Sequence, residues 1–248
     1  MLLLYIAGAG CALLLLYILL LCVCCLFVDP RREYEKHNSF YRFLLDSATA
    51  VAIRVLRIRV HVTGIEKLPA DQNILFVGNH RSNFDPIVTW YALKKWKIAY
   101  ISKPENFRIP VFGRIIRRCC FLPIDRKDPR HALVTVNKAA KLLREQPVSV
   151  GVYPEGTRSK DGQLLPFHNG VFKIAEKAEA PVAVICVTGT ETIAGRTPFR
   201  ATDVYLDITE VFDGGSIKET KSAMIGSAVH RSLEINMEKR NRKWEKNM

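Results

Sequence analysis

Residues 74–86 read ILFVGNHRSNFDP, and in them a continuous apolar run leads into a polar turn that contains His80 and Asp85. Such a run is typical of a strand that is buried on both faces of a parallel sheet. In α/β folds, reactive groups lie at the carboxyl ends of strands of this kind. The stretch therefore predicts a buried strand at 73–77, followed directly by a candidate functional turn.

Strand-like and helix-like segments alternate on both sides of this stretch. Further strands are expected at 57–62, 98–102, 119–124, 148–153, 182–187 and 204–211. Helices are expected at 86–95, 129–145, 171–178 and 217 to about 238. This order predicts an α/β fold with a mixed, largely parallel sheet flanked by helices.

The first 28 residues contain no charged residue, and the apolar run ends at Asp29-Pro30. A helix of this length would extend about 42 Å, more than the roughly 30 Å of a bilayer's hydrocarbon core. A cleaved secretory signal would need a basic start and a small-residue cleavage site, and neither is visible. We therefore expect a single transmembrane helix in the cell membrane. Arg31 and Arg32 follow it directly and predict that the body lies on the cytoplasmic side.

The pattern divides the chain into four parts. Residues 1–28 form the expected anchor, 29–63 a linking helix and the first strand, 64–238 the main domain, and 239–248 a basic tail. The helical period of 38–56 fits either a core helix or a helix in the membrane interface. The tail is expected to be solvated, or to contact an anionic membrane.

The composition is that of an ordered, strongly basic chain. Of the 248 residues 48% are hydrophobic, which excludes a disordered protein, and 37 Lys and Arg exceed 24 Asp and Glu by 13. The expected partners are therefore anions: phosphate groups, acidic lipid surfaces, nucleotides or nucleic acid. The three cysteines of the body are expected to be free thiols, and no metal or redox site is expected among the four in the leader.

Several common catalytic motifs are missing from the sequence: G-x-G-x-x-G, G-x-x-x-x-G-K-S/T, G-x-S-x-G and H-E-x-x-H. Their absence argues against dinucleotide binding, P-loop chemistry, the common serine hydrolases and zinc proteases. The candidate chemistry therefore rests on the polar turns that follow the apolar strands.

His80 and Asp85 are five residues apart, which in a continuous helix would separate their directions by about 140°. Contact between them therefore requires a turn, and the residues between and before them are rich in turn-forming Gly, Asn and Ser. A carboxylate on one imidazole nitrogen would fix the tautomer and leave the other nitrogen free as a general base. The spacing equally allows Asp85 to cap a helix that begins at Pro86, with His80 an ordinary loop residue.

Cations follow several other predicted strands. Glu155 is expected to orient Arg158, whose guanidinium suits a phosphate, while Gly156 permits close backbone approach and Thr157 adds a hydroxyl. The alternative is a surface turn with an ordinary ion pair. The full set of candidate phosphate-binding residues is Lys103, Arg126, Glu155, Gly156, Thr157 and Arg158. With His80 and Asp85, this set suits deprotonation of a hydroxyl on a phosphorylated substrate.

Four ordered blocks resemble those of the glycerolipid acyltransferases. They are Asn79-His80 with Asp85 (the NHX4D block), 121–126, Glu155-Gly156-Thr157-Arg158 (the EGTR block) and 180–182. The blocks lie in the family's order and spacing between about residues 60 and 190. Within that family the chain most resembles the bacterial, membrane-bound 1-acyl-sn-glycerol-3-phosphate (lysophosphatidic acid) acyltransferases, which make phosphatidic acid.

The resemblance implies a reaction. His80, held by Asp85, would remove the proton of the sn-2 hydroxyl of lysophosphatidic acid as it attacks the thioester of acyl-CoA or acyl-carrier protein. The implied partners are the lysophosphatidic acid, the acyl donor and the lipid bilayer. It implies no metal, no cofactor beyond the acyl donor as co-substrate, and no nucleic acid.

The chain departs from the family pattern at three positions. Cys120 stands where the second block usually has Gly, His168 stands where Lys commonly follows the EGTR block, and Val184 replaces a Pro of the fourth block. These changes leave the His–Asp pair intact and bear on acyl-chain and headgroup preference.

Two alternatives remain at this point. In the first alternative, the acyl acceptor is another lyso-lipid, glycerol 3-phosphate or an amino-lipid. The cations at the strand ends favour an acceptor with a phosphate but do not distinguish the rest of the acceptor. The other alternative is a non-enzymatic, membrane-tethered module that binds anions such as nucleic acid. It leaves the His–Asp turn without a role, and the exposed aromatic residues typical of single-strand binders are missing.

Overall fold

The computed structural model describes residues 1–245, with side chains described except at 2–4, 6–7 and 241–245. Seven strands form one sheet in the order β1-β7-β6-β2-β5-β3-β4. The strands are β1 (Ile58–Thr63), β2 (Leu75–Gly78), β3 (Ala99–Ser102), β4 (Leu122–Pro123), β5 (Val150–Val152), β6 (Val182–Thr188) and β7 (Thr202–Phe212).

The sheet is largely parallel, as predicted. Only β6 and β7 pair in antiparallel fashion, and the other neighbouring strands run in the same direction. The central strands β2, β5 and β6 are buried along their whole length, which explains their continuous apolar sequences. Each of the seven predicted strands is present, so the prediction of a mixed, largely parallel α/β fold is confirmed.

The prediction for β4 was too long. A strand was expected over 119–124, but Cys119 is the C-cap of a helix and Cys120 has a φ of 63°, a left-handed conformation that ends the helix. Only Leu122 and Pro123 pair with β3. A short apolar run does not distinguish a strand from the end of a buried helix.

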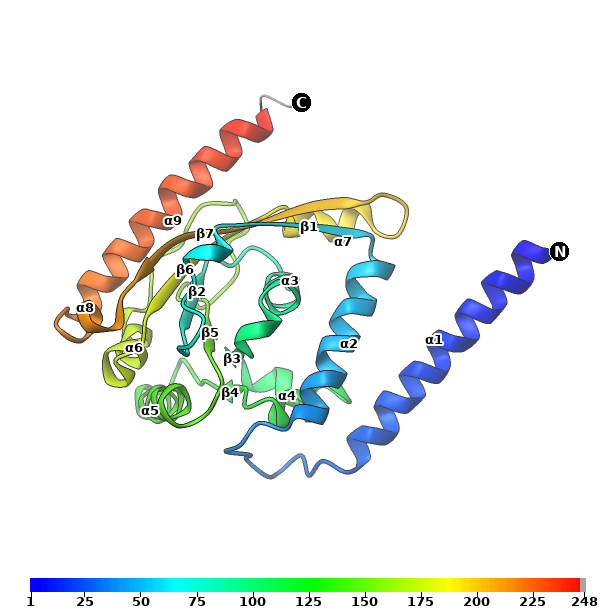
Figure 1. Ribbon diagram of the computed structural model, residues 1–248, viewed down its shortest axis with the longest axis horizontal. Coiled ribbons are helices and arrows are strands. Elements are labelled where there is room, and N and C mark those ends of the chain that lie inside the picture. Colours follow the sequence, from blue (N-terminus) through cyan, green and yellow to red (C-terminus); the bar gives the residue numbers. More distant parts are fainter. Residues whose placement is uncertain (246–248) are drawn as a thin grey trace.

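Helices cover both faces of the sheet (Figure 1). On one side lie α5, α6 and α9, and on the other lie α2 and α3. The helices are α1 (Leu2–Leu26), α2 (Ser39–Val55), α3 (Asp85–Ala92), α4 (Phe112–Arg118), α5 (Pro129–Glu145), α6 (Lys173–Ala178), α7 (Ile193–Arg196), α8 (Gly214–Lys218) and α9 (Ser222–Glu245). Short 3-10 turns, η1 (Ile65–Lys67), η2 (Lys94–Trp96), η3 (Pro104–Arg108), η4 (Asn169–Phe172) and η5 (Thr190–Thr192), join them.

The last predicted helix differs from the structure at both ends. One helix was expected from 217 to about 238, but the chain forms α8 and then α9, which continues to Glu245. Residues 239–245 of the basic segment therefore extend a helix, and residues 246–248 lie outside the described part. Arg240 joins this helix to the sheet through an ion pair with Asp207 of β7.

Helix α1 projects from the body toward its amino end (Figure 1). Residues Gly8–Leu26 are long and apolar enough to cross a membrane, with a mean hydropathy of 2.8, and they are almost wholly exposed. The carboxyl half of α1 contacts the body, because Tyr17 hydrogen-bonds Ser47 of α2 at 2.7 Å and the Tyr41 hydroxyl donates to the carbonyl of Cys24.

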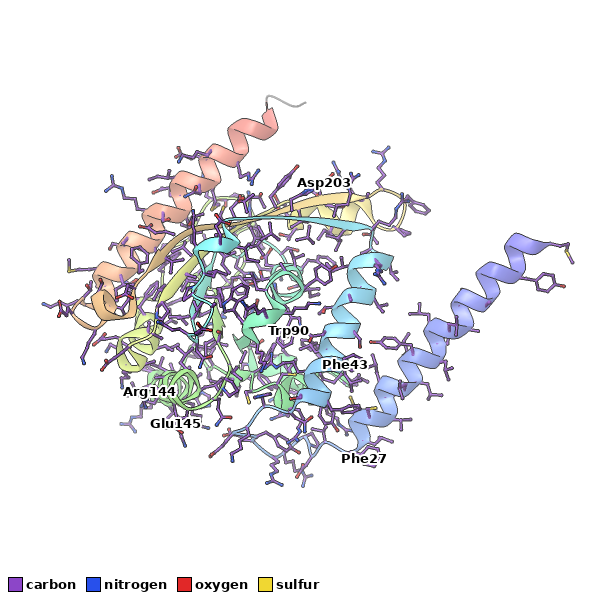
Figure 2. The ribbon with its side chains drawn as sticks, in the orientation of Figure 1. Phe27, Phe43, Trp90, Arg144, Glu145 and Asp203 are labelled. Atoms are coloured by element: carbon purple, nitrogen blue, oxygen red, sulfur yellow. The ribbon has the colours of Figure 1, made fainter. Side chains whose placement is uncertain are left out.

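Helix α2 lies between α1 and the sheet. Asn38 caps its start by accepting hydrogen bonds from the backbone N–H groups of Phe40 and Tyr41. Its outer side carries Phe43, and Trp90 of α3 lies on its inner side (Figure 2). The inner side also buries Arg42, whose guanidinium lies over the Trp90 ring at 4.8 Å.

Candidate active site

The candidate site begins where β2 ends, at the centre of the sheet. The side chain of Asn79 continues the pairing of β2 with β6, because its amide donates to the carbonyl of Val187 and its oxygen accepts the Val187 N–H, both at 2.8 Å. This pairing fixes the direction in which the chain leaves the sheet. His80 is the next residue, so the two hydrogen bonds between the Asn79 side chain and the Val187 backbone help to fix its position.

His80 and Asp85 are in contact, as one of the two interpretations of their spacing required. Nδ1 of His80 lies 2.8 Å from Oδ2 of Asp85. The same oxygen accepts the backbone N–H groups of Arg81 and Ser82 at 2.7 and 2.8 Å, and the other oxygen accepts the Thr190 hydroxyl. Asp85 is fully buried, and its carboxylate faces back into the turn. The alternative, in which Asp85 caps the following helix, is therefore wrong.

The imidazole ring is held on one face as well. Tyr153, at the end of β5, stacks on His80 with ring centroids 4.4 Å apart and planes 18° apart. Tyr100 stacks in turn on Tyr153 at 5.9 Å. The His80 side chain keeps 18% of its surface exposed, and its Nε2 has no hydrogen-bond partner among the described residues. One ring nitrogen is thus fixed by a carboxylate, and the other is free to accept a proton.

Glu155 ties the turn after β5 to the turn after β2. It is buried, and its carboxylate accepts the backbone N–H groups of His80 at 2.6 Å and Leu165 at 3.0 Å. Burial raises the pKa of Glu155, and these two N–H donors oppose the rise. Glu155 was expected to orient Arg158, but it pairs with the backbone of His80 and Leu165 instead.

The remainder of the EGTR block lies against His80. The Ser159 N–H donates to the carbonyl of His80 at 2.8 Å, so hydrogen bonds to His80 flank Gly156, Thr157 and Arg158. Thr157 and Arg158 are exposed, and Arg158 makes no ion pair with any residue whose side chain is described. Arg158 thus lies on a turn whose two ends are hydrogen-bonded to the backbone of His80.

Arg126 also reaches this turn. Gly156 has a φ of 72°, and a Cβ built on it would lie 2.9 Å from Cδ2 of His168 and 3.6 Å from Cδ of Arg126. Gly156 thus lets the backbone pass close to two basic side chains. Arg126 also interacts electrostatically with Glu105 of η3.

Lys103 is placed less directly. It lies exposed at the end of β3, where it caps η3, and the described residues give it no hydrogen bond or ion pair with the His80 turn. The structure therefore brings together His80, Asp85, Glu155, Gly156 and Arg126, with Thr157 and Arg158 on the same turn, and leaves Lys103 at the neighbouring strand end.

Two contributors had no signal in the sequence. Thr190 follows β6 and lies 105 positions from Asp85, so only the pairing of β6 with β2 brings it to the carboxylate. Tyr153 precedes the EGTR block, but its stacking on His80 depends on β5 lying next to β2.

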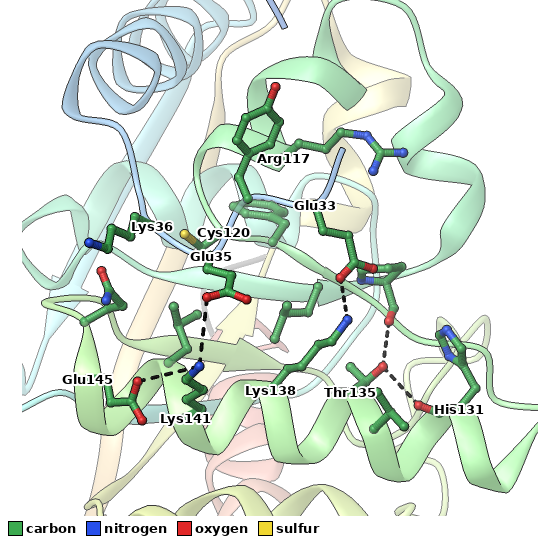
Figure 3. A pocket seen from close by; sticks show the side chains of 17 residues that line it. Glu33, Glu35, Lys36, Arg117, Cys120, His131, Thr135, Lys138, Lys141 and Glu145 are labelled. Carbon is green, nitrogen blue, oxygen red and sulfur yellow. Dashed lines mark hydrogen bonds and ion pairs between the residues drawn. The ribbon is translucent and has the colours of Figure 1, made fainter. Parts of the chain in front are cut away.

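A separate cavity of about 400 Å³ lies under the segment that joins α1 to α2 (Figure 3). Its floor is apolar and includes Phe121 and Leu142, and ion pairs such as Glu33 with Lys138 cross its rim. Neither His80 nor Asp85 lines it.

Comparisons with known proteins find a family, sequence relatives and a solved structure that are similar to this chain. The family model described as Acyltransferase matches residues 59–188, about half of the chain. A chloroplastic 1-acyl-sn-glycerol-3-phosphate acyltransferase of Brassica napus is 35% identical over 157 residues, which are 63% of this chain and 44% of the relative. The corresponding chloroplastic protein of Arabidopsis thaliana is 34% identical over 169 residues, 68% of this chain and 45% of the relative.

Bacterial proteins match over a larger share of their length. A 1-acyl-sn-glycerol-3-phosphate acyltransferase of Haemophilus influenzae is 27% identical over 183 residues, 71% of this chain and 75% of the relative. The crystal structure of the 1-acyl-sn-glycerophosphate acyltransferase of Thermotoga maritima superposes with a TM-score of 0.67 and 26% identity, covering 81% of each chain.

The chain spans less than half the length of the two plant relatives, although the matched part contains the whole turn-and-strand arrangement around His80. The family model matches from β1 to the end of β6 and so includes His80, Asp85 and the EGTR turn. Thr190, which donates to Asp85, lies two residues beyond the match. The chain belongs to the acyltransferase family.

Proposed function

We propose that this protein transfers a fatty acyl group from acyl-CoA or acyl-carrier protein to the sn-2 hydroxyl of 1-acyl-sn-glycerol-3-phosphate, giving phosphatidic acid. The observation that carries the proposal is the His80–Asp85 pair: Asp85 is buried, Nε2 of His80 has no partner among the described residues, and hydrogen bonds join the His80 backbone to both ends of the turn that carries Arg158. The names of the relatives support the same acceptor.

His80 acts as the general base in this proposal. Its Nε2 takes the proton of the sn-2 hydroxyl while that oxygen attacks the thioester carbonyl. The tetrahedral oxyanion then collapses and expels the thiolate, which takes the proton back from the imidazolium. The buried Asp85 carboxylate stabilises the imidazolium, and Tyr153 holds the ring plane. Proton transfer by a positioned histidine contributes about 10²–10⁴ in rate.

The acceptor's phosphate is assigned to the EGTR turn. Arg158 and Arg126 supply guanidinium groups, and Gly156 and Thr157 allow close approach and a hydroxyl contact. Lys103 is proposed as a further cation at the rim. Glu155 contributes by holding the backbone of this turn to His80.

His168 belongs to the same turn. Its ring lies against Gly156, at the sequence position where related proteins commonly have Lys. An imidazole can donate to a phosphate when protonated and accept or donate when neutral, so we propose that it replaces part of the missing charge.

The chain is proposed to be anchored in the cell membrane by α1, with the body on the cytoplasmic side. The length and apolar surface of α1 support the anchor, and Arg31 and Arg32 at its carboxyl end support the orientation. A membrane anchor keeps the domain next to an acceptor that is itself a lipid.

The proposal is tested by assaying the purified full chain with radiolabelled acyl-CoA and acyl-carrier protein against a panel of acceptors. The panel contains lysophosphatidic acid, glycerol 3-phosphate, a lyso-phospholipid with a larger headgroup, and an amino-lipid. We expect lysophosphatidic acid to have the highest kcat/KM, and a higher value for another acceptor would reassign the substrate.

The matched variants are His80→Ala and His61→Ala. The proposal requires His80→Ala to lower kcat by about 10²–10⁴. His61 is an exposed histidine of β1 that pairs with Asp203, and its removal should leave kcat within about threefold, since exposed ion pairs contribute little. More than about a tenth of the activity remaining in His80→Ala would exclude the general-base role.

A further inference from the structure

The loop between α7 and β7 presents an isolated aromatic residue to the surroundings. Phe199 is 85% exposed, although it lies in a folded part of the chain. Its neighbours Arg196, Pro198 and Arg200 are also exposed. A single exposed Phe is ordinary on a protein surface, so what distinguishes this one is its setting between two exposed arginines, close to exposed residues of α2.

The loop is held in place by hydrogen bonds. The Thr197 N–H donates to the carbonyl of Ile193 at 3.0 Å, and the Arg200 N–H donates to the carbonyl of Arg196 at 2.9 Å. The Arg57 guanidinium donates to the carbonyl of Phe199 at 3.0 Å. Phe199 is thus presented on a fixed turn that is joined to the end of α2.

The register of the sheet gives the position of this loop. Thr202 at the start of β7 is opposite Ile58 at the start of β1, and Tyr205 is opposite Thr188 at the end of β6. The loop therefore lies at the end of the sheet where β6 has its carboxyl end. Helix α2 ends on the same side, and Thr190 contacts the Asp85 carboxylate there. Figure 1 shows the α7–β7 connection beside the carboxyl end of α2.

The surface around the loop is basic and partly apolar. Arg54 and Val55, at the end of α2, are exposed beside Arg57. Residues 193–200 contain two arginines and no acidic residue. Further along α2, the exposed Phe40 and Phe43 lead toward the contact with α1. The apolar helix α1 contacts α2 through Tyr17 and Ser47, so α2 lies between the loop and the candidate membrane span.

We propose that the loop 196–200 is a second membrane contact, in which Phe199 inserts into the interfacial region of an anionic bilayer while Arg57, Arg196 and Arg200 meet lipid phosphates. Aromatic side chains prefer this region, and arginines near it are attracted to anionic headgroups. The contact is separate from α1 and turns the His80 edge of the sheet toward the membrane surface.

The proposal goes beyond the acyl-transfer function and is tested without an activity assay. The full chain carrying Phe199→Trp is reconstituted into vesicles of anionic phospholipid with brominated acyl chains, and its fluorescence is compared with that of the wild type. Met224→Trp serves as the matched control, because Met224 is exposed near the start of α9, on the side of the molecule opposite α1.

We expect brominated lipid to quench the fluorescence that Phe199→Trp adds and to leave the fluorescence that Met224→Trp adds unchanged. Changing Arg196 and Arg200 to Gln in the Phe199→Trp chain should reduce the quenching by about half or more in anionic vesicles. Equal quenching of the two reporters would overturn the proposal. So would a detergent-soluble dimer that Phe199→Glu dissociates, because it would identify a second copy of the chain as the occupant.

Discussion

Four donors converge on the carboxylate of Asp85, and three of them belong to the turn that carries His80. The fourth, the Thr190 hydroxyl, follows the strand on the other side of β2. An aspartate that accepts this many hydrogen bonds in a buried position is held in one orientation, which is what a general base needs from its partner.

Asp85→Asn should keep the turn and lose the charge. The remaining amide oxygen can accept the His80, Arg81 and Ser82 donors, and the amide group can donate to Thr190. The bond from His80 then goes to a neutral oxygen in place of a charged one. A hydrogen bond to a charged group contributes about 1.5–3 kcal/mol, so its weakening predicts a fall in kcat of up to about 150-fold. Steady-state kinetics of the purified variant measure it.

Thr190→Val provides the control for this variant. It removes only the hydroxyl on Oδ1 and leaves the three bonds on Oδ2 in place, so kcat should fall by no more than about tenfold. If Thr190→Val lowers kcat more than Asp85→Asn does, the geometry of the turn matters more than the charge, and the role given to the carboxylate is wrong.

Tyr153 is the second residue that determines the position of His80. Tyr153→Leu removes the stacked ring, whose contribution of about 0.5–1.5 kcal/mol predicts a loss of about 2- to 12-fold in kcat. Tyr153→Phe keeps the ring and should stay close to wild type. An unchanged pH–rate profile in Tyr153→Leu, together with unchanged kcat, would show that the stacking has no part in catalysis.

At the scale of elements, the EGTR turn depends on a conformation that only glycine adopts easily. Gly156 has a φ of 72°, and an added Cβ would meet the His168 ring at 2.9 Å. Gly156→Ala combines left-handed strain of about 1–2 kcal/mol with this clash. We expect KM for the phosphate-bearing acceptor to rise about tenfold or more, because the turn must shift away from Arg126 and His168.

Gly170→Ala is the matched substitution in the same segment. A Cβ there meets nothing within 4 Å, so activity and thermal midpoint should remain near wild type. Equal behaviour of the two alanine variants in acceptor titrations and thermal unfolding would contradict the role given to the Gly156 turn.

His37, a titratable residue, lies in the segment that joins α1 to α2. Burial, and then the charges of Arg42 and Lys97, lower the pKa of His37. The folded state therefore disfavours the protonated imidazole. Its contribution to stability is present above the unfolded pKa of about 6.5 and is lost as the pH falls through the lower folded value.

His37→Gln should accordingly flatten the fall in thermal midpoint between about pH 7 and pH 5, because the substituted side chain does not titrate. Lys36→Gln changes the adjacent exposed charge and should keep the wild-type slope. Parallel midpoint curves for His37→Gln and the wild type would refute the assignment.

The sequence predicted the elements that carry a clear pattern. The run 74–77 is apolar without interruption because both faces of β2 are covered, and α5 begins at Pro129 after the Asp128 cap, as its sequence indicates. Helix α4 was missed because its seven residues, FGRIIRR, are too few to show a helical period.

Site residues that lie close together in the sequence could be predicted to meet, and those far apart in the sequence could not. His80 and Asp85 lie within one turn, so their spacing and the turn-forming residues around them predicted a contact as one of two possible interpretations. Thr190 and Tyr153 reach His80 and its partner only through the strand order β6-β2-β5, which no local pattern encodes. The predicted partner of Glu155 was wrong for a related reason, because the backbone of His80 comes within reach only when β2 and β5 pair.

At the scale of the whole molecule, the site residues come from the carboxyl ends of neighbouring strands. β2 supplies His80, β5 supplies Tyr153 and Glu155, and β6 leads to Thr190. The connection to β7 then carries Phe199 along the same edge. Chemistry and the proposed lipid contact thus share one side of the sheet, as a catalytic domain needs when its acceptor stays in a bilayer.

The orientation of the molecule can be tested in sealed membrane vesicles. Arg31 and Arg32 directly after α1 favour retention of the body on the cytoplasmic side. Trypsin should therefore digest the body in inside-out vesicles and leave it intact in right-side-out vesicles until detergent is added. A tag fused to the carboxyl-terminal end reports the digestion. Cleavage in intact right-side-out vesicles would place the body on the outer side, where cytosolic acyl-CoA and acyl-carrier protein do not reach His80.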